Sequence, residues 1–295
     1  MRELYRATLE RLGRDLVEIA HLVHRAMVDA RTALEAADVH GAERVISEDA
    51  RIDRLQEALN EQAVRLLALQ APVAGDLRAV VASLRMSASL ERMGDLARHL
   101  AQLTRLRYPE HAIPADVRPV FIAMADASVE VSEEVVRLLE TRDLVHADRI
   151  HALNDDVNEL HASVFRSIAS PTWTASPAST TDVTLASRYL ERFTDHGLSV
   201  AAKATYLVTG ELTPPTARPN PGPPEPAARP LPDAGPRRRG PHLHREVRAP
   251  SSCGGAEGQC LASPWAATAA APAAAASGSR YRPCGVTGLK FWSSS

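Results

Sequence analysis

The sequence predicts an all-α protein built from two tandem three-helix bundles, with an extended tail behind them. Residues 1–212 are rich in Ala, Leu, Arg and Glu, which lose little side-chain freedom in a helix. Apolar residues recur there every three or four positions, and two short motifs each occur twice. The predicted boundaries are 1–107 for the first three-helix repeat, 115–212 for the second and 213–295 for a disordered tail.

The first predicted helix begins close to the N-terminus and carries one continuous apolar stripe. The stripe consists of Leu9, Leu12, Leu16, Ile19, Val23, Ala26, Ala30 and Ala33. Because these residues follow one another in steps of three and four, they share one face of a helix of about 35 residues. The sequence therefore predicts a long first helix that packs along its whole length.

Two further stripes predict the second and third helices. The second stripe consists of Ile52, Leu55, Leu59, Leu66 and Leu69, and the third begins with Leu77, Val81, Leu84 and Ala88. Helix-breaking or turn-forming residues lie near positions 38–41, 72–75, 109–119, 141–143 and 171–177. Since these segments interrupt the helical pattern at regular intervals, they divide residues 1–212 into six long helices.

An internal repeat groups the six helices into two sets of three. The residues 34–38 (LEAAD) return at 139–143 as LETRD, and 90–95 (LERMGD) return at 190–195 as LERFTD. Two motifs in the same order indicate a duplicated unit. We therefore expect helices one to three and four to six to form two related bundles.

Acidic side chains interrupt the third stripe. Continued with its own spacing, this stripe reaches Glu91 and then Asp95, so both are predicted to face the bundle interior one turn apart. Gly94 lies between them, where it permits a close approach to the backbone. Asp49 and Asp53 have the same four-residue spacing on the second helix. A partly buried group of four carboxylates requires a compensating cation or protonation.

The residues leave two kinds of compensation open. Oxygen ligands suit Mg²⁺, Mn²⁺, Ca²⁺ or iron, and His99 is spaced to add a nitrogen ligand. Alternatively, Arg54, Arg92 and Arg98 neutralise the acids as ordinary ion pairs.

Three strings in the sequence resemble the PhoU family: LERMGDLA at 90–97, RYLERFTDH at 188–196 and YLVTGE at 206–211. The resemblance extends over residues 1–212 and implies two three-helix bundles that bind metal ions in clusters. It implies a regulator, without catalysis of its own, that represses the phosphate-starvation response when phosphate is plentiful. The implied partners are the sensor histidine kinase of the phosphate regulon and the ATPase subunit of the phosphate ABC transporter.

Position by position, the resemblance also implies the metal ligands and a difference between the repeats. The implied ligands are Asp49, Asp53, Glu91, Asp95, Glu191 and Asp195. The implied ions are iron, zinc, manganese or magnesium. Asn154 and Asn158 stand where the second repeat should have acids, and Thr194 replaces the glycine found at position 94. We therefore expect the first site to bind metal better, and metal binding at the second is left open.

Composition excludes several classes of protein. Residues 1–212 contain no cysteine, which argues against a disulfide scaffold or a zinc–thiolate site in this part of the chain. No secretory signal and no bilayer-spanning apolar stretch is evident. Residues 1–212 are acidic overall and lack a stripe of basic residues that could bind nucleic acid. We expect a cytoplasmic protein that is peripheral to the membrane through its partners, and a homodimer is left open.

A ferritin-like, carboxylate-bridged di-metal oxidase is the alternative function. Such enzymes use Glu-x-x-His pairs on the helices of a bundle. Glu18 and His21 have this spacing, but no second Glu-x-x-His occurs in helices two, three, five or six. The regulator is therefore the favoured interpretation.

Overall fold

The computed structural model describes residues 2–70, 72 and 74–210, and within them it contains six α-helices and no strand. The helices are α1 (Arg2–Ala36), α2 (Val39–Gln70), α3 (Ala74–Arg107), α4 (Arg118–Thr141), α5 (Val145–Ile168) and α6 (Pro177–Thr209). The all-α prediction is confirmed, and the helix ends coincide with the predicted breakers. The predicted tail at 213–295 lies outside the described residues.

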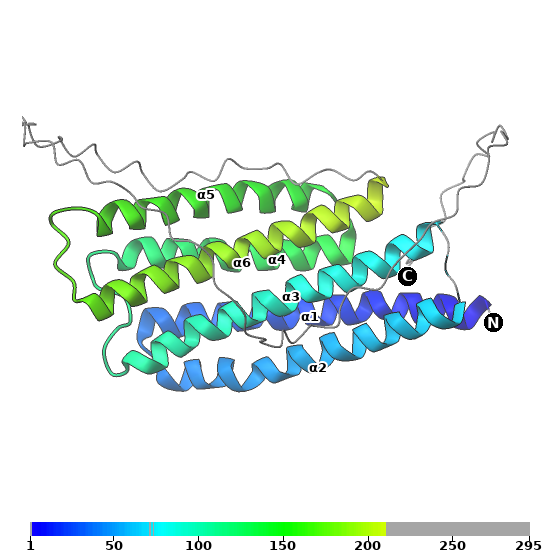
Figure 1. Cartoon of the computed structure of the whole chain (residues 1–295), viewed down its shortest axis with the longest axis horizontal. Coiled ribbons are helices and arrows are strands. Elements are labelled where there is room, and N and C mark those ends of the chain that lie inside the picture. Colours follow the sequence, from blue (N-terminus) through cyan, green and yellow to red (C-terminus); the bar gives the residue numbers. More distant parts are fainter. Residues whose placement is uncertain (1, 71, 73, 211–295) are drawn as a thin grey trace, which may run out of the picture. The chain divides into compact units, whose positions relative to one another are not determined.

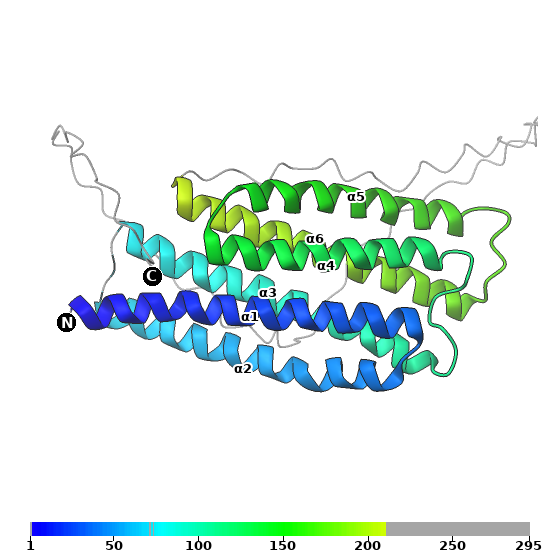
Figure 2. The same ribbon diagram turned by 180° about the vertical axis from the view of Figure 1, so that it is seen from behind.

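The helices pack as two groups of three that share one interface. Within α1–α3 each helix contacts the other two, and the same holds within α4–α6. The groups meet where α1 lies beside α4 and where α3 lies beside α6 (Figures 1 and 2). Among the six described helices, α2 contacts only α1 and α3, and α5 contacts only α4 and α6. Helices α2 and α5 therefore keep one face free of the other helices.

The turns after α1 and α4 have the same construction. Ala37 and Arg142 both have positive φ, 52° and 60°. Asp38 and Asp143 follow them, and each accepts a hydrogen bond at Oδ1 from the backbone N–H two residues later, at 3.0 and 3.1 Å. These residues fall in the repeated motifs at 34–38 and 139–143, so the duplication preserves a local turn as well as a helix order.

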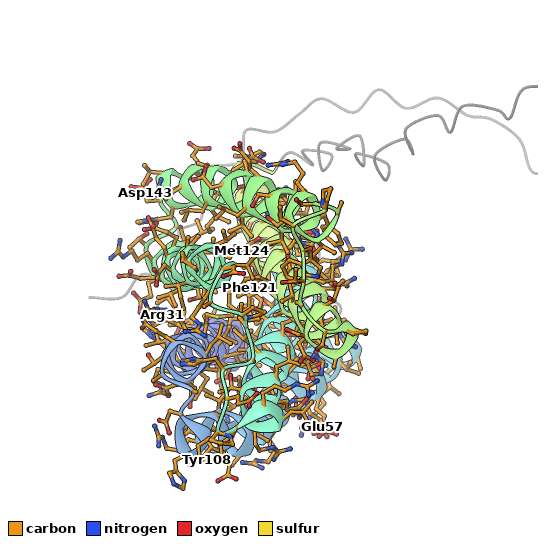
Figure 3. The ribbon with its side chains drawn as sticks, turned by 90° about the vertical axis from the view of Figure 1, so that its left-hand side faces the viewer. Arg31, Glu57, Tyr108, Phe121, Met124 and Asp143 are labelled. Carbon is orange, nitrogen blue, oxygen red and sulfur yellow. The ribbon has the colours of Figure 1, made fainter. Side chains whose placement is uncertain are left out.

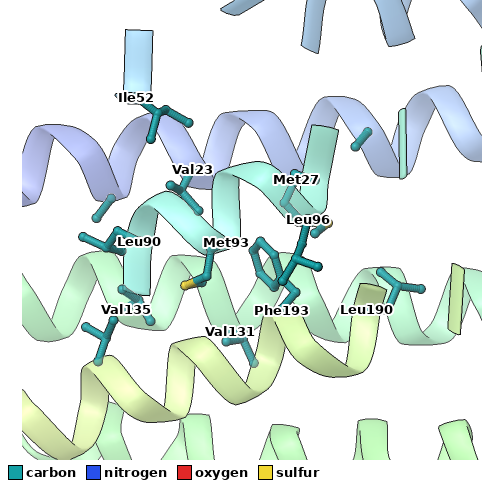
Figure 4. Close-up of a cluster of buried hydrophobic side chains, with 14 of the residues drawn as sticks. Val23, Met27, Ile52, Leu90, Met93, Leu96, Val131, Val135, Leu190 and Phe193 are labelled. Carbon is teal, nitrogen blue, oxygen red and sulfur yellow. The ribbon is translucent and has the colours of Figure 1, made fainter. Parts of the chain in front are cut away.

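The hydrophobic core is continuous across the two groups. The predicted stripe on α1 is buried except for Ala26, which is half-buried. Phe121 and Phe193 are the bulkiest fully buried side chains. Figure 4 shows Phe193 of α6 close to Met27 of α1 and Met93 of α3. Viewed along the helices, Phe121 lies inside, whereas charged side chains cover the outside (Figure 3).

The predicted inward stripe on α3 is only partly right, although its member Leu84 packs against the core. Leu77 is 42% exposed and Ala88 is also exposed, whereas Leu90 and Met93 are fully buried. Because α3 contacts α1, α2 and α6, it is apolar on several sides, and a single stripe does not identify its core face. Leu69, the last member of the α2 stripe, is likewise 77% exposed.

Among the helices in the part of the chain that the structure describes, none combines the length and the hydropathy needed to cross a bilayer.

His24 links the two groups of helices. Its Nδ1 lies 2.9 Å from Ser132 Oγ on α4. Ser132 Oγ donates its own hydrogen to the Val129 carbonyl, so the histidine N–H is the donor in this contact. Burial lowers the pKa of His24, and Glu133 partly opposes this shift. The fold therefore favours the neutral imidazole.

We predict that replacing Ala37 by Gly stabilises the fold. A non-glycine residue with positive φ carries a steric cost, so Ala37→Gly should raise the free energy of unfolding by about 1 kcal/mol. Urea denaturation followed by circular dichroism measures the change. The matched control is Ala58→Gly on an exposed face within α2, which should lower stability by about 1 kcal/mol. A loss of stability in both variants would contradict the prediction.

We predict that His24 makes stability depend on pH. The unfolded chain binds a proton at this residue at a higher pH than the folded chain does, so stability rises with pH. The contribution of His24 is present above about pH 6.5 and is lost as the pH falls below that value. His24→Asn keeps an N–H donor for Ser132 and should make the rise of melting temperature between pH 5 and pH 8 less steep, while the other histidines whose pKa burial lowers keep part of it. His111→Asn, in an exposed loop, should leave the profile unchanged.

Candidate metal centre

The first acidic cluster lies between α2 and α3, on the flank of α3 rather than in the bundle centre. Asp49 on α2 is buried, Glu91 and Asp95 on α3 are half-buried, and Asp53 is exposed. Burial raises the pKa of Asp49; Arg98 opposes this shift, and Asp53 and Asp95 add to it. Burial also raises the pKa of Glu91, with Asp95 as the next cause. The structure thus brings the four acids into one electrostatic cluster.

Two arginines of α3 supply positive charge to this cluster. Arg98 Nε lies 2.5 Å from Asp49 Oδ2, and an Arg98 terminal nitrogen lies 2.6 Å from Asp95 Oδ1. Arg92 lies 3.1 Å from Asp95 and 3.5 Å from Glu91. Arg98 therefore joins α2 to α3 through two carboxylates, whereas Arg92 pairs with acids of its own helix.

Gly94 permits the close approach of α2. A Cβ atom at this position would lie 2.9 Å from Ile52 Cδ1 and 3.5 Å from Asp49 Oδ1. The missing side chain thus makes room for Ile52, which is buried. The space over the backbone of Gly94 is filled by an apolar side chain of this protein.

The first cluster does not fit a metal ion in this conformation. Across residues 2–70, 72 and 74–210, no group of three or more His, Cys, Asp or Glu side chains is arranged to hold one. The ring of His99 lies tilted at 39° against Tyr189, with centroids 5.2 Å apart. Its buried Nδ1 has no hydrogen-bond partner, so this nitrogen by itself does not argue against a ligand. Metal ligation by Asp49, Asp53, Glu91 and Asp95 stays a prediction from the sequence.

The second cluster lies between α5 and α6. It has the neutral amide of Asn154 at the position where the first cluster has the carboxylate of Asp49. Asn154 is fully buried, and its Nδ2 donates to Asp195 Oδ1 at 3.0 Å and to Thr194 Oγ1 at 3.1 Å. Glu191 is buried and pairs with Arg188 at 2.7 Å. Burial raises the pKa of Glu191, and Asp195 adds to the shift.

Asn158 does not turn toward the acids of α6. Its Nδ2 donates to the backbone oxygen of Asn154 at 2.8 Å and to Asn154 Oδ1 at 3.1 Å. Because amide N–H groups point at the acceptors around Asn154 and Asp195, this arrangement does not fit a cation either. Ligation by Glu191 and Asp195 also stays a prediction.

Some buried ion pairs were not predicted from the sequence. Asp182 on α6 is 4% exposed and accepts two hydrogen bonds from Arg107 on α3, at 2.5 and 3.1 Å. Glu134 on α4 pairs with His146 of α5 at 2.6 Å and with Arg137 at 3.0 Å. The partners Arg107 and Asp182 are far apart in the chain, and no motif marks them.

The residues of the oxidase alternative lie on the outside of α1. Glu18 pairs with Arg51 of α2 at 2.8 Å, and His21 pairs with Glu140 of α4 at 2.9 Å. All four side chains are about half exposed and line one open groove. They do not point into the bundle core, where a ferritin-like centre is built.

Comparisons with known proteins match both groups of helices. Residues 16–104 and 121–204 match the PhoU domain family. Phosphate-specific transport system accessory protein PhoU homolog 2 of Mycobacterium tuberculosis is 40% identical over 210 residues, covering 71% of this chain and 99% of that protein. PhoU homolog 1 of Mycobacterium leprae is 38% identical over 212 residues, covering 72% and 96%.

Solved structures show the same fold. The crystal structure of PhoU from Pseudomonas aeruginosa aligns with a TM-score of 0.61 at 26% identity, covering 70% of this chain and 99% of that chain. The phosphate transport system regulatory protein PhoU from Streptococcus pneumoniae aligns with a TM-score of 0.64 at 24% identity, covering 72% and 100%.

We predict that a carboxylate at position 154 destabilises the second group of helices. Asn154→Asp removes both N–H donors and buries a charge beside Asp195 and Glu191. The free energy of unfolding should fall by about 3 kcal/mol, as measured by urea denaturation. Asn158→Asp on the half-buried side of α5 is the control and should cost less, because water reaches that side chain. Equal losses in the two variants would argue against the role given to Asn154.

Proposed function

Because the chain belongs to the PhoU family, we propose that it regulates phosphate transport and represses the phosphate-starvation response while phosphate is plentiful. One observation carries the proposal: both groups of helices match the PhoU domain, and the relatives are matched over nearly their whole length. Those relatives are named as accessory proteins of the phosphate-specific transport system.

The proposed mode of action is binding of other proteins without catalysis. Several of the buried charges described above are used in contacts that hold helices together, such as Arg107 with Asp182 between α3 and α6. The proposed partners are the sensor histidine kinase of the phosphate regulon and the ATPase subunit of the phosphate ABC transporter. Binding at the cytoplasmic side would place the protein at the membrane through these partners.

The side of α5 that no other described helix covers supports binding to a basic surface, and one of its acids, Asp155, also pairs with His151 of the same helix at 3.4 Å. Asp155, Asp156 and Glu159 are all exposed on this helix, which contacts only α4 and α6. Charges at the rim of an interface steer association and select partners more than they add affinity. We therefore assign this acidic face, defined by Asp155, Asp156 and Glu159, to contact with the kinase or the ATPase subunit.

Deletion of the gene tests the function. In medium rich in phosphate, the deletion should raise expression of the phosphate-uptake genes several-fold, and the full chain supplied in trans should restore repression. Transcript levels measure the effect. Unchanged expression in the deletion strain would refute the proposed repression.

Binding measurements test the acidic face of α5. The triple variant Asp155→Asn, Asp156→Asn, Glu159→Gln should weaken binding to the purified kinase or ATPase subunit by about tenfold at low salt. A matched variant, Glu43→Gln, Glu48→Gln, Glu57→Gln, removes three exposed charges of α2 and should bind like the unmodified chain. Equal loss in both triple variants would mean that net charge, and not this face, decides binding.

A further inference from the structure

We propose that Arg98 is the built-in cation of the first acidic cluster and takes the place that the family resemblance assigns to a metal ion. The guanidinium, and not an ion from solution, would hold Asp49 of α2 against Asp95 of α3. This inference does not depend on the proposed function.

Arg98 contacts an acid on each of the two helices. Its guanidinium donates a hydrogen bond to Asp95 at 2.6 Å, and its buried Nε lies 2.5 Å from Asp49 in an ion pair without hydrogen-bond geometry, so one cation contacts one carboxylate on each helix. The side chains of Asp49, Asp95 and Arg98 are only 10%, 18% and 24% exposed. At such low exposure an unpaired carboxylate is costly, and a cation on two carboxylates removes most of that cost. A metal ion bound by both acids would have to displace Arg98.

The second repeat provides an internal comparison. The repeated motifs align Asp49 with Asn154 and Arg98 with Leu198. Where the acid is replaced by a neutral amide, the arginine is replaced by an apolar residue that packs against the core. The chain thus has either both members of the ion pair or neither. This is the pattern expected if Arg98 exists to compensate Asp49.

The packing around Asp49 also favours Arg98 over a metal ion. Ile52 fills the space over Gly94, beside Asp49, so apolar atoms and a guanidinium surround the buried carboxylate. A guanidinium keeps its charge throughout the physiological pH range. The bridge between α2 and α3 is therefore independent of metal supply.

Metal content and thermal stability test the inference on the purified full chain. After incubation with Fe²⁺, Zn²⁺ or Mn²⁺ and desalting, the unmodified protein should retain less than about a tenth of an equivalent of metal at this cluster, and EDTA should not change its melting temperature. Arg98→Leu copies the residue of the second repeat. It should lower the melting temperature by about 10 °C, and Mn²⁺ or Zn²⁺ should restore part of the loss.

Two further variants show whether any loss of stability in Arg98→Leu comes from the unpaired charge of Asp49. Arg54→Leu removes an exposed arginine of α2 and should change neither the metal content nor the melting temperature by more than about 2 °C. Asp49→Asn with Arg98→Leu removes both charges, as in the second repeat, and should recover most of the stability lost in Arg98→Leu.

Two outcomes would overturn the inference. One is an unmodified protein that retains an equivalent of metal which Glu91→Gln and Asp95→Asn together abolish. The other is a double variant, Asp49→Asn with Arg98→Leu, that is as unstable as Arg98→Leu alone, because the arginine would then act by something other than charge compensation.

Discussion

Compensation of charge between packed helices is the constraint on which this structure depends. The bundle is all-α, and its helices cross at seams where acidic side chains lose much of their water. An acid left without a partner at such a seam would cost several kcal/mol. Each buried acid among the described residues has a nearby donor or cation: Asp49 has Arg98, Glu134 has His146 and Arg137, Asp182 has Arg107, and Glu191 has Arg188 of its own helix. These pairs occupy the places where polar side chains interrupt the apolar packing of the helices.

The two halves of the duplication keep their turns and differ in their centres. The turns at Asp38 and Asp143 retain both the left-handed residue before them and the side-chain hydrogen bond, because a turn is fixed by a few neighbouring residues. The two clusters between the helices depend on contacts with neighbouring helices, so a change at one position favours a matching change at the position it contacts. Asp49 pairs with Arg98 in the first cluster, whereas Asn154, at the equivalent position, donates hydrogen bonds to Thr194 and Asp195 in the second.

The chain belongs to the PhoU family, and side chains of its own join its helices at several interfaces, as Arg107 and Asp182 join α3 to α6. Rigid helices suit the proposed role in protein binding, since the acidic face of α5 would keep its geometry when it meets a partner. Ion pairs between α3 and α6, such as Arg107 with Asp182, would keep the two groups of helices in a fixed relation during binding.

The sequence by itself determined the helix count, the helix boundaries, the duplicated order and the family, because these depend on local periodicity, breakers and short motifs. It also placed Asp49, Asp53, Glu91 and Asp95 as candidates that belong together. Only the tertiary structure decided which face of α3 is buried, since that helix packs against three others and Leu77 and Leu90 look alike in the sequence. It also showed where Arg98 lies: its guanidinium reaches both Asp49 and Asp95, because α2 comes within contact of Gly94 and carries Asp49 to it.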